Sequence, residues 1–201
     1  MSNVKFDAIL EAATKLFVRH GYQKTSIDDI CGEAKIGKGT VYHYFESKED
    51  IFVAILKKIS VDVWADMRRN IDRAGNFEEK FKAFFTVPVD ALKSNRQLFM
   101  QVLTEDSFSF LQRINEFKSD TEGNFYDVLT SIFQYGVETN VLRKEFSEKM
   151  PDVVSLMYRL LVATRIDKIH FTELTDDTFH EIVEERRLLA EVLIKGFVGN
   201  G

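Results

Sequence analysis

Residues 25–48, TSIDDICGEAKIGKGTVYHYFESK, constrain the fold most strongly because they contain two short helical patterns joined by a tight turn. Thr25 and Asp28 have the spacing of a capping box, which predicts where the first helix starts. Gly37 predicts the reversal, since glycine readily adopts the left-handed backbone conformation. A second helical pattern then runs from Lys38 to about residue 45. The segment is typical of a helix-turn-helix.

The second helix of this pair offers side chains suited to DNA. Val41 and Phe45 lie four residues apart and share an inward face. The remaining side chains project outward or sideways, and their donors and rigid rings suit base edges and phosphates: Lys38, Thr40, Tyr42, His43 and Tyr44. The alternative for the two tyrosines is packing against neighbouring helices. A second capping box, Ser47 with Asp50, predicts another helix and holds Lys48 at its opening.

A nucleotide-binding loop overlaps the same residues. The sequence GEAKIGK at residues 32–38 fits the first seven positions of a P-loop. Gly39 then occupies the position where a serine or threonine must bind magnesium, and the preceding residues favour a helix over a buried strand. We therefore interpret this match as coincidence.

The segment resembles the TetR family of bacterial transcriptional regulators. The similarity is dense over residues 6–56 and includes TSIDDICGEAKIGKGTVYHYFESKEDI at residues 25–51. The resemblance implies phosphate contacts by Thr25 and Lys48, a close backbone approach at Gly39, and recognition-helix contacts by Lys38, Thr40, Tyr42, His43 and Tyr44. Two positions depart from the family pattern: Lys35 replaces a common glycine, and Gly37 replaces a serine that usually caps the recognition helix.

The rest of the chain favours an all-α fold. Only two prolines occur in 201 residues, at 88 and 151, and no alternating strand pattern is evident. We expect a three-helix DNA-binding domain at residues 1–47 and a larger helical domain at residues 48–201. Within the latter, helical patterns cover residues 47–74, 77–94, 97–106, 122–140, 151–171 and 177–197, with a less regular stretch before residue 118.

The net charge of −5 is unevenly distributed. Residues 1–60 carry nine Lys or Arg against eight Asp or Glu, and the remainder carries eighteen against twenty-four, giving +1 and −6. This balance favours localised phosphate contacts over a broad basic surface. The N-terminal residues lack the apolar core of a signal peptide, and no apolar run approaches a membrane span, so we expect a cytoplasmic protein. The lone cysteine, Cys31, is expected to be a small core residue.

Aromatic residues are concentrated in the second domain. Ten of the eighteen phenylalanines lie between residues 77 and 133. Such a stripe is usually core, but the family resemblance implies an effector cavity here, and Pro88 would kink a helix beside it. The candidate lining residues are Trp64, Met67, Phe84, Phe99, Met100, Leu103, Phe125, Phe133 and Tyr158, with Arg159 and Arg165 as anchors for an acidic ligand. They suit an apolar or amphipathic effector such as a fatty acyl chain, a drug or an aromatic compound.

The last two helical patterns, at residues 151–171 and 177–197, have broad apolar faces. The resemblance implies that they form a four-helix bundle with a second copy of the chain. Such a homodimer would place two recognition helices about one DNA turn apart on a palindromic operator.

An enzymatic function finds little support. Asp167 with His170 and Asp177 with His180 have spacing that suits helical metal ligands, but partner glutamates are not identifiable. No nucleophile elbow, HExxH motif or zinc-ligand spacing occurs, and no cofactor is implied. We therefore expect a ligand-responsive regulator, in the first place a repressor released from its operator by an effector. The alternatives are a helical ligand- or metal-binding enzyme with a vestigial DNA-binding head, and an activator without an effector.

Overall fold

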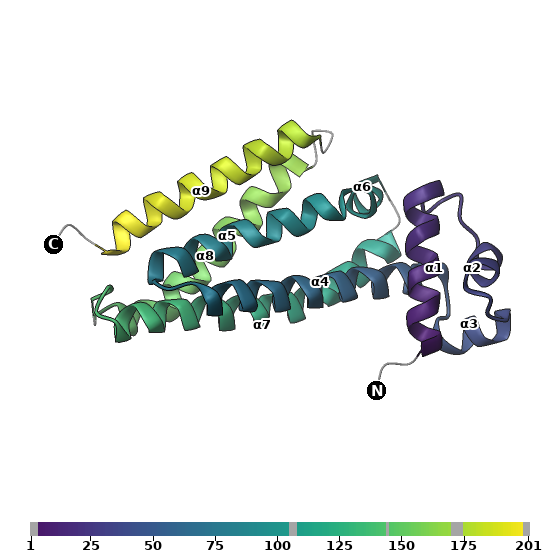
Figure 1. Cartoon of the computed structure of the whole chain (residues 1–201), viewed down its shortest axis with the longest axis horizontal. Helices are drawn as coiled ribbons and strands as arrows, with labels where there is room; N and C mark the ends of the chain where they lie inside the picture. Colours follow the sequence, from purple (N-terminus) through teal and green to yellow (C-terminus); the bar gives the residue numbers. More distant parts are fainter. Residues whose placement is uncertain (1–3, 105–107, 144, 170–174, 199–201) are drawn as a thin grey trace. The chain divides into compact units, whose positions relative to one another are not determined.

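The computed structural model describes the backbone of residues 4–104, 108–143, 145–169 and 175–198. Side chains are described in these ranges except at residues 102–104, 108–122, 145 and 160–169. The described residues are helical and form no strand, which confirms the predicted all-α fold (Figure 1). The helices are α1 (Val4–His20), α2 (Ile27–Ala34), α3 (Lys38–Tyr44), α4 (Lys48–Arg73), α5 (Phe77–Ser94), α6 (Arg96–Thr104), α7 (Phe108–Glu138), α8 (Glu145–Ile169) and α9 (Asp176–Val198).

The chain divides into two compact units. The head unit comprises Met1–Val61 and Gln97–Phe117, and the effector unit comprises Asp62–Arg96 and Lys118–Gly201. This division differs from the boundary expected between residues 47 and 48. The start of α4 belongs to the head, because Ile51, Phe52, Ile55 and Leu56 are buried in its core.

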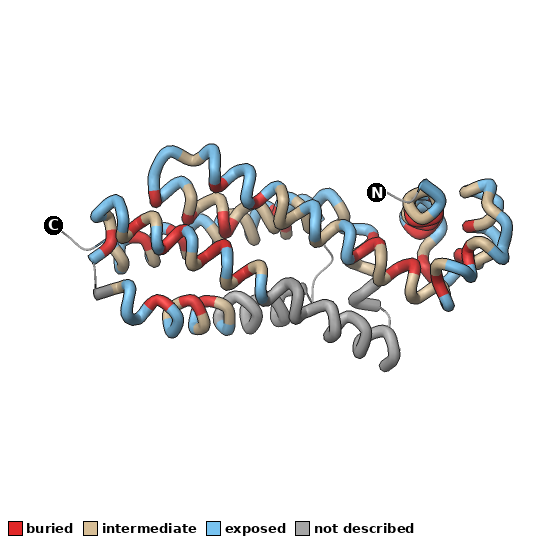
Figure 2. The backbone as a smooth tube through the Cα atoms, turned by 90° about the horizontal axis from the view of Figure 1, so that it is seen from below, coloured by how far each residue is buried: buried red, intermediate tan, exposed pale blue. Residues whose placement is uncertain are grey.

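The head unit is organised around α1. Its buried face consists of Ile9, Leu10, Ala12, Ala13, Leu16 and Phe17, and Figure 2 shows buried positions recurring along the helices. The helix ends at Gly21, whose φ of 88° favours glycine and whose N–H donates to the Phe17 carbonyl at 2.9 Å. Ile30, Val41 and Phe45 complete the core from the helix-turn-helix.

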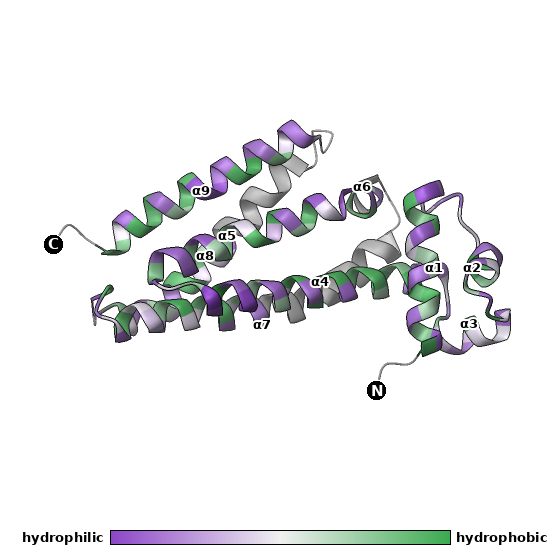
Figure 3. Cartoon of the chain, viewed as in Figure 1, coloured by the Kyte–Doolittle hydropathy of each residue, from purple (hydrophilic) through white to green (hydrophobic). Residues whose placement is uncertain are grey.

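The effector unit is built around phenylalanine rings. The α5 helix is capped by Asn76, which accepts a hydrogen bond from the Glu79 N–H at 2.9 Å. Its bounds match the predicted 77–94. The α5 and α9 helices lie side by side (Figure 1). Figure 3 shows apolar and polar positions alternating along α9, as expected for a helix with one buried face.

Two predicted helix bounds were wrong. The stretch before residue 118, expected to be irregular, belongs to the continuous α7 helix. No proline interrupts this stretch, so weak apolar periodicity alone does not end the helix. The α8 helix begins at Glu145 instead of residue 151. Pro151 therefore lies inside a helix, at the cost of one backbone hydrogen bond.

Candidate DNA interface and effector region

The α2 helix begins one residue later than its sequence pattern indicates. Ser26, not Thr25, is the cap, and its hydroxyl accepts from the Asp29 N–H at 3.1 Å. Asp29 completes the capping box by accepting from the Ser26 N–H at 2.8 Å. Hydrogen bonds from the side chain and backbone of Ser26 hold the pKa of Asp29 below its usual value. The predicted box of Thr25 and Asp28 was therefore wrong by one position.

Thr25, predicted to contact phosphate, lies inside the head unit. Its side chain is buried, with 3% of the residue exposed. Its hydroxyl donates to the carbonyl of Gly21 at 2.9 Å, near the end of α1. This buried hydroxyl with an internal acceptor helps to position the α1–α2 loop.

The turn between the two helices is also arranged differently from the prediction. Lys35, not Gly37, is left-handed, with φ 55° and ψ 39°. The N–H of Ile36 donates to the Cys31 carbonyl at 3.1 Å and closes α2. Gly37 has a φ of −64° and caps α3 without a side-chain hydrogen bond. The left-handed position thus stays where the family pattern has glycine, although this chain has lysine there.

The α3 helix presents most of the predicted DNA contacts to solvent. Val41 and Phe45 are buried, at 0% and 5% exposure, as predicted. Tyr42 is 49% exposed, and Lys38, Gly39 and His43 are also exposed. Thr40 and Tyr44 are half-buried. Tyr44 packs edge-on against Phe6, with 6.0 Å between ring centroids. Its ring therefore has a packing role whatever its hydroxyl contacts.

Lys38 forms an ion pair within the helix-turn-helix. Its Nζ lies 2.7 Å from Oδ1 of Asp28, in the first turn of α2. The hydrogen bond and negative charge of Asp28 raise the pKa of Lys38. The pair connects the two helices across the turn at the solvent surface.

Lys48, predicted to bind phosphate, is held by contacts inside the head unit. The capping box of Ser47 and Asp50 is present, with Asp50 accepting from the Ser47 N–H at 2.9 Å. Lys48 Nζ donates to the carbonyls of Tyr22 at 2.7 Å and Thr25 at 2.9 Å. It also lies 4.2 Å from the centroid of the Tyr22 ring. Lys48 therefore connects the α1–α2 loop to the start of α4 through hydrogen bonds.

Gln101 on α6 is a structural contact of the head unit that no local sequence pattern indicates. Its Oε1 accepts from the Tyr22 N–H at 2.6 Å, and its Nε2 donates to the Phe17 carbonyl at 3.0 Å. Leu98 of the same helix is buried in the head core at 2% exposure. These partners are about eighty residues away in sequence, so only the tertiary fold brings them together.

Most residues predicted to line an effector cavity belong to the core of the effector unit. These are Trp64, Met67, Phe84, Phe125, Phe133 and Tyr158. Their rings pack on one another, with 5.0 Å between the centroids of Phe84 and Phe125 and 5.1 Å between those of Phe125 and Tyr158.

The other predicted cavity residues do not pack in this core or are not described. Phe99 packs against the core of the head. Its neighbour Met100 is half-buried and also lies in the head. Arg159 is exposed. The side chains of Leu103 and Arg165 lie outside those described.

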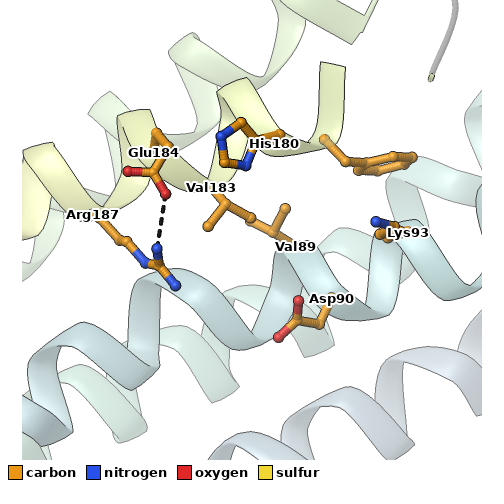
Figure 4. Close-up of a pocket in the computed structure, with 8 residues that line it drawn as sticks. Val89, Asp90, Lys93, His180, Val183, Glu184 and Arg187 are labelled. Atoms are coloured by element: carbon orange, nitrogen blue, oxygen red, sulfur yellow. Dashed lines mark hydrogen bonds and ion pairs between the residues drawn. The ribbon is translucent and has the colours of Figure 1, made fainter. Parts of the chain in front are cut away.

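A shallow groove of about 180 Å³ lies between α5 and α9 (Figure 4). Charged side chains of both signs surround it, and Arg187 donates to Glu184 at 2.8 Å. The lining residues are Val89, Asp90, Lys93, Phe179, His180, Val183, Glu184 and Arg187. This volume is smaller than the roughly 300–1,000 Å³ of sites for drug-sized ligands, so the groove does not suit a large apolar effector.

The residues that the structure describes bring together no group of three or more His, Cys, Asp or Glu side chains that could hold a metal ion. Asp177 and His180 lie near the start of α9. Of the other pair, the Asp167 side chain and His170 are outside the described residues. Cys31 is half-buried.

Comparison with known proteins identifies the head. Residues 9–55 match the family described as bacterial regulatory proteins, tetR family. This range includes α2 and α3 and ends in the first part of α4. Residues 9–55 therefore form a DNA-binding domain of the TetR family. The chain is a transcriptional regulator with an N-terminal helix-turn-helix.

Similarity to individual regulators extends beyond the head. The chain is 21% identical over 195 residues to the fatty acid metabolism regulator protein of Bacillus subtilis (strain 168), covering 96% of this chain and 95% of that protein. It is 24% identical over 166 residues to the transcriptional repressor KstR2 of Mycobacterium tuberculosis (strain ATCC 25618 / H37Rv), covering 79% and 76%.

The fold is shared with a solved relative. The structure of the regulator FadR from Bacillus subtilis in complex with stearoyl-CoA superposes with a TM-score of 0.65 at 20% identity, covering 96% of this chain and 99% of that chain. Among the residues that the structure describes, no helix is both long and apolar enough to span a membrane.

Proposed function

We propose that this TetR-family regulator is a homodimeric repressor that binds a palindromic operator and is released by a long-chain acyl-CoA. The observation that carries the proposal is the likeness over nearly the whole chain to a fatty acid metabolism regulator, together with the shared fold of a relative bound to stearoyl-CoA. Binding to chromosomal DNA would place its action in the cytoplasm.

The operator contacts are assigned to the exposed side of α3. Lys38, Tyr42 and His43 supply donors at solvent-exposed positions, and Gly39 allows close approach of the backbone. Thr40 and Tyr44 would contribute their partly exposed polar atoms. The internal hydrogen bonds of Lys48 support a positioning role for this residue, and the salt dependence of a Lys48 variant separates that role from phosphate binding.

An acyl chain suits the effector unit because its interior consists of apolar and aromatic side chains. Phe84, Phe125 and Tyr158 form connected ring contacts within this core. Since these rings pack on one another, entry of a chain requires them to move apart. The ligand then favours the conformation in which the rings are separated, and its differential affinity for that conformation drives release from DNA.

Dimerisation is assigned to α8 and α9. Both helices carry large apolar side chains exposed to solvent in the single chain: Leu156 at 50%, Leu188 at 62% and Val192 at 59%. Exposed apolar side chains grouped on a helix favour association with a partner. A two-fold dimer through these helices would supply the paired heads that a palindrome requires.

The test begins with selection of bound duplexes from a random DNA pool by the purified protein. We expect enrichment of a palindrome whose half-sites lie about one turn apart. Palmitoyl-CoA, coenzyme A and palmitate are then titrated separately into the complex while the fluorescence anisotropy of the labelled duplex is followed. Release by palmitoyl-CoA alone supports the proposed effector. Equal release by palmitate would reassign the effector to free fatty acids, and no release by either would exclude the acyl class.

A further inference from the structure

Asp28 carries a charge that helix capping does not use. It lies beside Asp29 in the first turn of α2, but Asp29 makes the capping hydrogen bonds with Ser26. The Asp28 side chain is 70% exposed, and its carboxylate accepts from Lys38 Nζ at 2.7 Å. An acid at this position stabilises the helix by interacting with its dipole. The ion pair with Lys38 nevertheless places a carboxylate on the surface assigned to DNA.

Lys38 is the first residue of the recognition helix and is 54% exposed at its side chain. A lysine that neutralises one phosphate releases counterions and strengthens binding to any DNA sequence. A lysine already paired with a carboxylate releases fewer counterions, and the carboxylate itself repels phosphate. The pair therefore reduces the contribution of Lys38 to nonspecific binding.

We propose that Asp28 is a specificity-determining residue that restrains Lys38 from phosphate and so favours the operator over random DNA. This inference rests on the proposed DNA-binding function. On random DNA, Lys38 gains only a phosphate and must leave Asp28 to reach it. On the operator, Lys38 donates to a base edge through one N–H of its ammonium group while another stays on Asp28, so this separation is not required.

The decisive variant is Asp28→Asn, which keeps the side-chain shape and removes the charge. If Lys38 becomes free to contact one phosphate, the slope of log affinity against log salt concentration grows in magnitude by about 0.9. Affinity then rises about fivefold at roughly 0.15 M salt. We therefore expect random-duplex affinity to rise by about this factor per subunit. Operator affinity should rise less, so the ratio of specific to nonspecific affinity falls.

Glu33→Gln is the matched control because Glu33 is exposed on the same helix and its removal changes the net charge equally. Lys38→Gln and the double variant complete the set. Affinities for a labelled operator and a labelled random duplex are measured by fluorescence anisotropy over a series of KCl concentrations. When Lys38 is already glutamine, we expect Asp28→Asn to change random-duplex affinity no more than Glu33→Gln does. Thermal unfolding checks that each variant is folded.

Equal changes in Asp28→Asn and Glu33→Gln would overturn the inference, because they would show a general charge effect. An Asp28→Asn effect that kept its full size without Lys38 would overturn it as well. If the wild-type chain bound neither duplex with salt-dependent affinity, the proposed function would fail and this inference with it. Wild-type binding combined with unaltered Asp28→Asn affinities would reject only the inference.

Discussion

The interior of the head unit and the interior of the effector unit are stabilised by different kinds of interaction. In the head, polar caps define the helix ends: Ser26 with Asp29 and Ser47 with Asp50, with Lys48 joining the loop to α4. In the effector unit, stacked and edge-on phenylalanine rings dominate, with Phe133 contacting the rings of Phe77, Phe81, Phe146 and Phe197. Directional polar contacts orient the short helices of the head, whereas non-directional apolar packing holds the helices of the effector unit together.

The largest expected effect is in the effector core. Phe133 is fully buried, and Phe133→Ala should destabilise this unit by about 3–5 kcal/mol. Trp64, the single tryptophan, packs against the same core, so denaturant unfolding followed by its fluorescence reports the change. Phe17→Ala is the matched variant, because Phe17 is fully buried in the head core. An equal shift of the Trp64 transition in both variants would show that the two units unfold as one.

Lys48→Met should have the next largest effect. It keeps the aliphatic stem but leaves the carbonyls of Tyr22 and Thr25 without a charged donor, which costs about 2 kcal/mol. Lys57→Met is the control, since Lys57 is exposed on the same helix. Unfolding followed by circular dichroism measures the stability. If stability were unchanged while the salt slope of DNA binding fell by about 0.9 per subunit, Lys48 would be a phosphate contact instead of a residue that stabilises the head unit.

Lys35→Gly should stabilise the head. Lys35 has a φ of 55°, and glycine relieves the left-handed conformation by about 1 kcal/mol, partly offset by its greater freedom when unfolded. Gly21, with a φ of 88°, provides the reverse experiment, and Gly21→Ala should destabilise. The denaturant midpoints of both variants are compared with that of the wild type. A destabilised Lys35→Gly variant would mean that the lysine side chain contributes more than its backbone strain costs.

Gly37→Ser should have the smallest effect. Gly37 caps α3 without a side-chain hydrogen bond, and a Cβ built there meets no atom within 4 Å. Serine should add a few tenths of a kcal/mol by accepting from an N–H in the first turn. Ser26→Gly removes the corresponding cap from α2 and should lower stability by a similar amount. Amide hydrogen exchange in α3 measures the gain, and unchanged protection would show that the introduced hydroxyl does not cap the helix.

Short-range patterns predicted much of the fold. The α5 helix has the predicted bounds, and Ser47 with Asp50 forms the predicted box. Two errors were shifts by one or two positions, from Thr25 to Ser26 and from Gly37 to Lys35. Thr25 and Ser26 both satisfy the local rule for a helix cap, so the choice between them depends on which residue the surrounding core buries. Thr25 is the buried one, and its hydroxyl donates to the Gly21 carbonyl.

The amino-acid sequence by itself determined the helical class, the helix-turn-helix and its outward-facing side chains, because these follow from contacts between residues three or four positions apart. Only the tertiary structure decided the partners of Lys38, Lys48 and Gln101, since a long polar side chain reaches several acceptors and folding selects among them. It also separated Phe99, packed in the head, from the phenylalanines of the effector core. The sequence around a phenylalanine does not indicate which of the two cores it joins, and only the path of the folded chain determines this.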